Sequence, residues 1–132
     1  MELISRYTRA QAIEDGVLVD LMQDETKGAV REAGYIIPLA MTATAFDLAV
    51  WPIDNEPADA WLRSKCQDLQ GRLWDVLWMM RNQVAGARSV GLFRLSIINH
   101  KTKRRNNITL KAVCGPNDDG MPCITIMLPD ED

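Results

Sequence analysis

The sequence LFRLSIINHKTKRRNNITLKAVCGPNDDGMPCITIML, residues 92–128, decides the fold class of this chain. A period of two between apolar and polar side chains is typical of strands with one buried face. Polar turns at residues 100–106 and 115–122 separate the alternating segments. We therefore predict a three-stranded antiparallel meander, with its strands at residues 92–99, 107–114 and 123–128.

The same alternation predicts how the last two strands pair. If their apolar faces share one core, Cys114 lies opposite Ile124 rather than opposite Cys123. A disulfide between the two cysteines is then disfavoured by geometry. With Cys66 the cysteines number three, there is no CxxC motif, and one histidine cannot complete a usual zinc set. We expect all three thiols to be reduced and largely buried.

Helical patterns dominate the chain before residue 86. Thr8 is a suitable N-cap and Gly16 a suitable end for a first short helix. Apolar residues at 17–21 and 35–37 leave one or two additional strands open. The prediction is a single α+β domain over residues 1–132, with N-terminal helices packed on the C-terminal meander. Helices are expected at residues 7–16, 29–34, 42–51 and within 60–85, with a loop at 53–59.

The longest predicted helix has a polar stripe and a wide apolar arc. Arg81 projects between Trp74 and Trp78, opposite the polar stripe, and a buried arginine needs an anion. Three interpretations stay open: an anion-binding site in an aromatic cleft, a structural pair with Asp20 or Asp47, or a helix that frays near its end so that the wheel misplaces Arg81. We expect Trp74 and Trp78 in the core. The stripe contains Lys65, Asp68, Arg72, Asp75, Asn82 and Gln83, and the core side contains Leu69, Leu73, Val76, Leu77, Met80 and Val84.

Charge is segregated along the chain. The 15 basic and 18 acidic residues give a net charge of −3. Residues 88–111 hold seven bases and no acid, which leaves 18 acidic residues against eight basic ones elsewhere. The chain has no apolar run of the roughly 18 residues that a membrane span needs. Its first residues also lack the apolar segment of a secretory signal, so we expect a cytoplasmic protein without membrane contact.

The basic stretch is the main candidate site. A basic hairpin attracts nucleic acids or acidic protein surfaces. The alternative is a solvated turn whose charges keep an exposed strand edge from aggregating. No aromatic residue lies among these bases, which disfavours stacking on single-stranded nucleic acid. The candidate partner-binding residues are Arg94, Lys101, Lys103, Arg104, Arg105 and Lys111, and we expect residues 101–105 to be exposed and free of internal ion pairs.

The sequence predicts no catalytic, cofactor-binding or metal-binding residues. It has no GxSxG motif, no P-loop and no GxGxxG. Its only histidine, His100, lies in the cationic turn, which is unfavourable for a general base. One enzymatic hypothesis remains, because Tyr7-Thr8 and Gly16-Val17-Leu18 resemble the opening of ADP-ribosyltransferase-like folds.

Three stretches, residues 7–20 (YTRAQAIEDGVLVD), 71–79 and 113–132 (ending CGPNDDGMPCITIMLPDED), resemble a family of small proteins of unknown function. Its members are carried on bacterial plasmids, integrative elements and phages. The resemblance implies a mobile-element accessory protein, and such proteins often counter restriction or CRISPR systems. The leading hypothesis is a non-enzymatic protein that binds an acidic host protein or complex. The alternatives are nucleic-acid binding by the hairpin at residues 94–111, and the ADP-ribosyltransferase-like enzyme.

Overall fold

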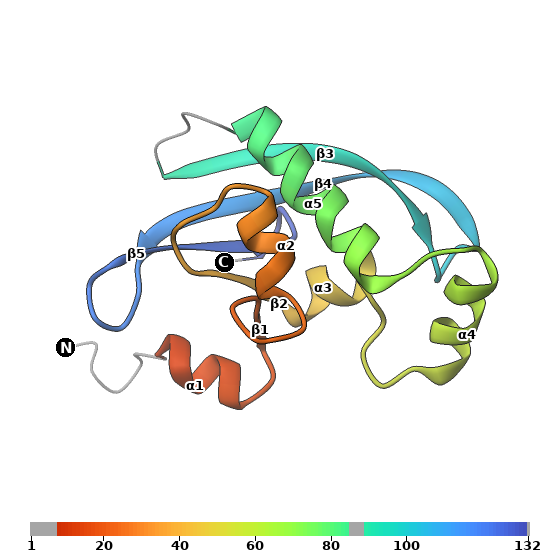
Figure 1. The fold of residues 1–132 in the computed structure, drawn as a ribbon, viewed down its shortest axis with the longest axis horizontal. Helices are drawn as coiled ribbons and strands as arrows, with labels where there is room; N and C mark the ends of the chain where they lie inside the picture. Colours follow the sequence, from red (N-terminus) through yellow and green to blue (C-terminus); the bar gives the residue numbers. More distant parts are fainter. Residues whose placement is uncertain (1–7, 85–88, 132) are drawn as a thin grey trace.

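The computed structural model describes residues 8–84 and 89–131, and it confirms the predicted α+β fold (Figure 1). None of the helices in these ranges is long and apolar enough to span a membrane. Arg88, the first base of the basic stretch, lies outside the described residues. The elements are α1 (Arg9–Glu14), β1 (Leu18–Asp20), α2 (Lys27–Glu32), β2 (Leu39–Thr42), α3 (Ala43–Ala49), α4 (Glu56–Ser64), α5 (Leu69–Val84), β3 (Val90–Asn99), β4 (Arg104–Pro116) and β5 (Pro122–Met127).

The strands form one mixed sheet in the order β1-β2-β5-β4-β3. The predicted meander is confirmed as β3-β4-β5, and only β2 and β5 pair in parallel. Of the two open strands, the first is β1. The second begins at Leu39 instead of lying at residues 35–37, because Pro38 has no N–H to donate to a ladder. Residues 35–38 instead form a loop, in which the Ile36 side chain is 96% exposed.

The predicted register of the last two strands is confirmed. Cys114 lies opposite Ile124, and Cys123 lies opposite Gly115. All three thiols are free, and Cys123 is buried. The prediction that every cysteine is largely buried is wrong for Cys66, which is exposed. Cys66 has a φ of 60°, the left-handed conformation of a residue at the end of a helix, so its side chain leaves the packed face.

The helices α1 and α3 begin and end close to where the sequence predicts, whereas α2 begins at Lys27, two residues before the expected start. The Thr8 hydroxyl accepts a hydrogen bond from the Gln11 N–H, and the Gln11 side chain accepts one from the Thr8 N–H, which completes a capping box. Gly16 follows α1 with a φ of 79°, a conformation that glycine adopts without strain. The Thr42 hydroxyl caps α3 by accepting from the Ala45 N–H.

The single long helix predicted within residues 60–85 is two helices. The side chain of Asn55 caps α4, and Pro57 occupies its first turn, where a missing N–H costs nothing. The prediction of a loop at residues 53–59 was therefore wrong from Glu56 onwards. The helical conformation is interrupted at Cys66. The Asp68 side chain then caps the start of α5 by accepting a hydrogen bond from the Gly71 N–H at 2.6 Å.

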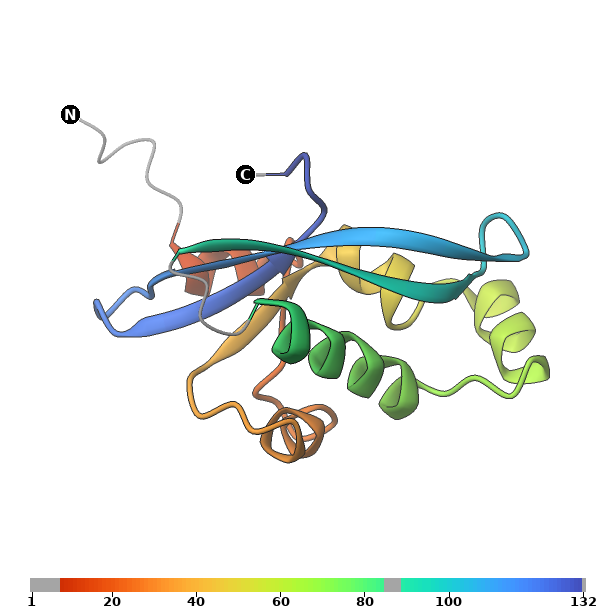
Figure 2. The same ribbon diagram turned by 90° about the horizontal axis from the view of Figure 1, so that it is seen from above.

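The helices α2, α4 and α5 lie on one side of the sheet, and the C-terminal tail lies on the other (Figure 2). We call the side that faces α5 the inner face; Phe93 and Leu110 are buried there as a cross-strand pair. The predicted core side of α5 is confirmed, since Leu73, Val76, Leu77 and Met80 are all buried.

The two tryptophans of α5 are less buried than predicted. Trp74 is half-buried, and Trp78 is 43% exposed. Their rings stack at a centroid distance of 5.4 Å, so each shields part of the other from water.

The strand β3 forms one edge of the sheet, and α5 covers part of its backbone. The Gln83 amide donates to the Arg94 carbonyl at 2.6 Å and accepts the Arg94 N–H at 2.8 Å. The Arg72 guanidinium donates to the Ile98 carbonyl at 2.9 Å. A side-chain amide therefore replaces a neighbouring strand at Arg94. Since open edges pair with other chains, these contacts protect the sheet from edge-to-edge association.

We predict that Gln83→Ala promotes self-association. The substitution frees the Arg94 N–H and carbonyl, and it costs about 1 to 2 kcal/mol of stability through two lost hydrogen bonds. Sedimentation velocity at rising protein concentration measures the association, and urea denaturation measures the stability. Asn82→Ala is the matched control, because Asn82 is exposed on the same helix and makes no side-chain hydrogen bond with the described residues. A monomeric Gln83→Ala protein would contradict the prediction.

Candidate partner-binding surface

The hairpin between β3 and β4 distributes the candidate cations over two faces. The residues of β4 alternate, so Arg105 pairs with Ile98 and Lys111 with Leu92 on the outer face of the sheet. Arg94 lies on the same face, opposite Thr109. Lys101 and Lys103 are in the turn, and Arg104 points to the inner side, because it pairs with the buried Asn99. The candidates are therefore not one continuous stripe.

The turn itself is fixed by Asn99. Its side-chain oxygen accepts the N–H groups of Lys101 at 2.8 Å and of Thr102 at 3.4 Å. Its carbonyl accepts the Lys103 N–H at 2.8 Å. Lys103 has a φ of 62° and closes the turn in the left-handed conformation. The cationic side chains thus start from a backbone that is held in one conformation.

The turn lies against α4, and this contact brings an aromatic ring to the bases (Figure 2). The Lys103 ammonium lies 4.5 Å from the ring centroid of Trp61, and the Lys65 ammonium lies 5.7 Å from it. Both distances are within the range of cation–π attraction. We call Trp61, Lys65, Lys101, Lys103 and Arg104 the tip surface. The sequence did not place Lys65 or Trp61 beside the bases of the hairpin, because the contact joins separate elements.

The four cations of the tip surface are exposed, as are Arg105 and Arg94. Within the described ranges, the ion pairs of lysine and arginine are Lys27–Asp24 and Arg63–Asp59, and the His100 ring lies beside the Asp47 carboxylate. The prediction that residues 101–105 are exposed and free of internal ion pairs is therefore confirmed for this part of the chain. Arg63 lies over Trp51, with 5.1 Å between its guanidinium carbon and the ring centroid.

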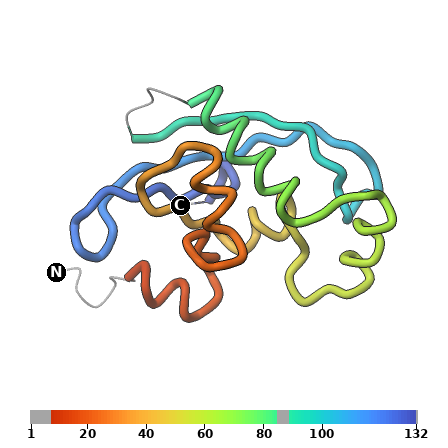
Figure 3. Tube along the Cα trace, in the orientation of Figure 1, coloured from red at the N-terminus to blue at the C-terminus, as the bar shows by residue number. Residues whose placement is uncertain are grey.

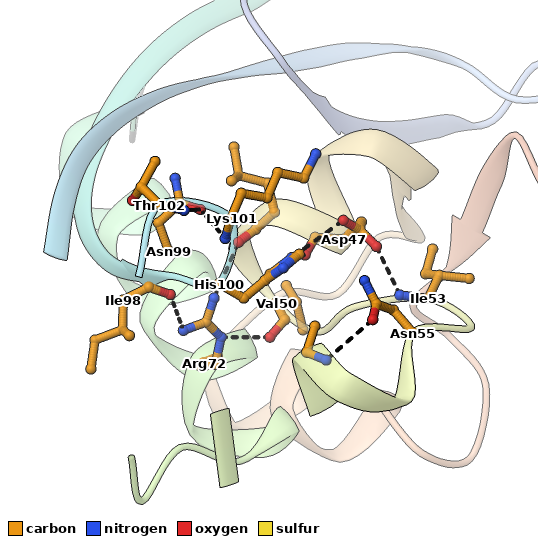
Figure 4. A network of polar contacts seen from close by, with 12 residues as sticks. Asp47, Val50, Ile53, Asn55, Arg72, Ile98, Asn99, His100, Lys101 and Thr102 are labelled. Atoms are coloured by element: carbon orange, nitrogen blue, oxygen red, sulfur yellow. Dashed lines mark hydrogen bonds and ion pairs between the residues drawn. The ribbon is translucent and has the colours of Figure 1, made fainter. Parts of the chain in front are cut away.

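His100 is buried at the base of the turn, where only 4% of it is exposed (Figure 4). Its Nε2 lies 3.0 Å from the Asp47 carbonyl oxygen and 3.3 Å from the Asp47 carboxylate. Because both neighbours are acceptors, Nε2 carries the proton. The other carboxylate oxygen accepts the Ile53 N–H at 2.8 Å. The contacts with Asp47 anchor the turn to α3.

The buried arginine of α5 is Arg72, which the sequence placed in the polar stripe (Figure 4). Its Nε donates to the Val50 carbonyl at 2.6 Å and its Nη2 to the Leu48 carbonyl at 3.1 Å. Its Nη1 donates to the Ile98 carbonyl and to the Gln67 side chain. Burial lowers the pKa of Arg72, and the Asp75 carboxylate partly offsets this.

Arg81 is exposed, so the prediction of a buried anion or salt-bridge site at Arg81 is wrong. Its guanidinium donates to the Ala33 carbonyl at the end of α2. Asp47, one of its expected partners, pairs with His100 instead. The helical wheel assigned the buried position to Arg81 and a surface position to Arg72. The structure has the reverse, because backbone carbonyls accept the hydrogen bonds of the Arg72 guanidinium inside the fold.

Lys111 is occupied by the C-terminal tail. Its ammonium donates to the Glu131 carbonyl, and the Glu131 carboxylate accepts the hydroxyls of Thr42 and Thr44, each at 2.7 Å. Burial acts to raise the pKa of Glu131, but hydrogen bonds from Thr44, the Leu128 N–H and Thr42, with the charge of Lys111, lower it overall. Lys111 therefore contributes less to a partner surface than the sequence predicts.

A groove of about 770 Å³ lies between α1 and the tail. The turn between β4 and β5 borders it and lies beside α1 (Figure 3). Asp118 accepts the N–H groups of Ala10 and Arg9, which lower its pKa. The Arg9 guanidinium donates to the Thr125 hydroxyl at 2.7 Å. Asp118 and Arg9 therefore form hydrogen bonds within the wall of the groove. No group of metal-ligating side chains exists among the described residues.

We predict that Arg72→Met lowers the free energy of unfolding by about 3 to 5 kcal/mol, because several buried acceptors lose their donor. Arg72→Lys should cost less, since an ammonium keeps the charge but cannot reach every acceptor. Chemical denaturation measures both. Arg31→Met, at an exposed position in the last turn of α2, is the control and should cost less than about 1 kcal/mol. A similar loss for both methionine variants would contradict this role.

We predict that the tail contact of Glu131 weakens in acid. A lowered folded-state pKa stabilises the fold above the ordinary glutamate pKa, and this contribution is lost as the pH falls through the lowered value. The stability gap between the wild-type protein and Glu131→Gln should therefore be largest at neutral pH and close towards pH 3. Urea denaturation at several pH values measures it. Glu32→Gln, an exposed residue of α2, should show no such closing gap.

The comparisons with known proteins identify a family but no function. The model of the family of unknown function DUF6573 matches residues 1–132, so the chain belongs to this family. Neither the curated proteins nor the solved structures gave a match.

Proposed function

We propose that this member of DUF6573 is a non-enzymatic binding protein that docks an acidic surface of a host protein or complex through its tip surface. One observation carries the proposal. Lys65 at the end of α4 and Lys103 of the hairpin turn lie over the Trp61 ring, Lys101 and Arg104 are exposed beside Lys103 in the chain, and no carboxylate among the described residues pairs with any of the four. Cations that are held in place but left unpaired are available to a partner's carboxylates.

The arrangement favours a protein partner over a nucleic acid. Two ammonium groups already lie close to the ring of Trp61, which leaves less of its face for a stacked base. Tryptophan and arginine are also enriched at the centres of protein interfaces. Outside residues 88–111 the chain has 18 acidic and eight basic residues, so its remaining surface repels phosphates. Nucleic acid is the alternative, and the aromatic ring among the bases is the feature in its favour.

The biological setting is the finer part of the proposal. The resemblance of residues 7–20 and 113–132 to proteins of mobile elements supports an accessory factor that acts on host defence. A chain of this size can act by occupying a functional surface of a larger complex. The ADP-ribosyltransferase hypothesis has no structural support of this kind, and an assay of NAD consumption tests it directly.

The test is a matched pair of double variants. Lys101→Ser with Arg104→Ser removes two cations from the tip surface, and Lys27→Ser with Arg31→Ser removes two from α2. Both should leave stability nearly unchanged, because exposed charges contribute about 0 to 1 kcal/mol each. In affinity capture from a nuclease-treated bacterial extract, we expect the control to retain the partner protein and the tip variant to lose it.

The opposing outcomes are equally specific. Capture that is unchanged in the tip variant would show that the tip surface is not the binding site. A nucleic-acid partner would give direct binding to a DNA or RNA duplex, with an affinity that falls steeply with salt. In that case each lost phosphate contact would reduce the slope of log K against log salt by about 0.9.

A further inference from the structure

A second surface lies on the other side of the same hairpin. The outer face of β3 and β4 is opposite the helices α2, α4 and α5 (Figure 2). Its cross-strand pairs include Val90–Val113, Leu92–Lys111 and Arg94–Thr109, and we call these six residues the outer ribbon face. Leu92 is 58% exposed and Val90 is 56% exposed. None of them belongs to the tip surface.

The composition of this face changes along the strands. One end carries the apolar pair Val90–Val113, Leu92 follows, and then comes the exposed guanidinium of Arg94. Among the described residues, the Arg94 side chain has no carboxylate within ion-pair distance. On the solvated face of an antiparallel strand most side chains are polar, whereas Val90 and Leu92 are apolar and exposed. An exposed apolar end beside an unpaired cation instead matches a partner with apolar and acidic side chains side by side.

We propose that the outer ribbon face binds an acidic amphipathic helix of a partner protein. Its apolar stripe would cover Leu92, Val90 and Val113, and its carboxylates would pair with Arg94. A helix already packs on the inner face of the same strand, since α5, a helix of 16 residues, covers β3 there. The proposed helix would pack on the outer face in the same way. From Val90 to Arg94 the outer ribbon face is about 13 Å long at 3.3 Å per residue. A helix of about 18 residues is about 27 Å long and therefore covers the whole of this face.

Duplex DNA is disfavoured as the occupant. Its grooves offer phosphates and base edges, which match Arg94 and Thr109 but leave Val90 and Leu92 against polar groups. The inference does not depend on the tip surface, since different residues and a different face carry it. One partner could contact both faces by wrapping round the hairpin, but each surface can be tested alone.

The test uses a synthetic 18-residue helical peptide with leucines on one face and flanking glutamates. Its twin has lysine in place of every glutamate. In an NMR titration with the whole protein, we expect the acidic peptide to bind with a dissociation constant below about 1 mM. The perturbed backbone signals should map to Val90, Leu92, Arg94 and Val113. The twin should bind at least about tenfold more weakly.

Two substitutions locate the binding. Leu92→Asp should weaken the acidic peptide by about tenfold or more, while Ile36→Asp, which changes an exposed isoleucine in the loop before β2, should have no effect. Arg94→Glu should reverse the preference between the two peptides. Circular dichroism confirms that each variant is folded, which is expected because all three side chains are exposed.

Three results would overturn the inference: no saturable binding of the acidic peptide, equal binding of the two peptides, or signals that shift away from the outer ribbon face. Displacement of the peptide by a DNA duplex at the same residues would assign the face to nucleic acid instead. The variant with Lys101→Ser and Arg104→Ser should still bind the peptide. The tip surface and the outer ribbon face can therefore fail separately.

Discussion

The guanidinium of Arg72 is the interaction on which the arrangement of the other elements depends. It has no partner carboxylate within ion-pair distance among the described residues, and its charge is compensated by backbone carbonyls. Two of these, Leu48 and Val50, are at the C-terminal end of α3, where unpaired carbonyls concentrate partial negative charge. The third, Ile98, pairs with Arg105 near the turn end of the β3–β4 ladder. One side chain thus joins α5, α3 and β3.

The tip surface follows from this junction. With α3 held against α5, the Asp47 carbonyl and carboxylate are in reach of His100, which fixes the start of the turn. The turn in this position places the Lys103 ammonium over the Trp61 ring of α4. Each step is a buried or half-buried contact, whereas the cations at the end of the series are exposed. A rigid backbone beneath exposed charges reduces the entropy that must be lost when a partner binds.

The sequence predicted best what depends on local period and least what depends on packing. Alternation identified β3, β4 and β5 and their register, because each has one buried face. It missed β2, whose four residues are all buried and therefore show no alternation. It joined α4 to α5, because the left-handed Cys66 at the break is neither glycine nor asparagine.

The candidate site shows the same division. The exposure of residues 101–105 was predictable, because long cationic side chains in a polar turn remain in water. The choice between Arg72 and Arg81 was not, because a helical wheel cannot show that α3 presents carbonyls to one of them. The participation of Trp61 and Lys65 depends on how α4 meets the hairpin, which no local pattern encodes.

The two proposed surfaces would contribute differently to one binding event. Exposed cations on an otherwise acidic chain attract a partner over about 8 to 10 Å at physiological salt, so the tip surface mainly sets the association rate and orientation. The contacts of Leu92 and Val90 act only after water is excluded, so the outer ribbon face mainly sets the dissociation rate. Since the tip surface lies at the turn and α4 while the outer ribbon face lies on the other side of β3 and β4, a partner that engages both must reach round the hairpin. The contacts of Arg72 and His100 at the turn end of the hairpin then keep the enclosed element from bending away from its helices.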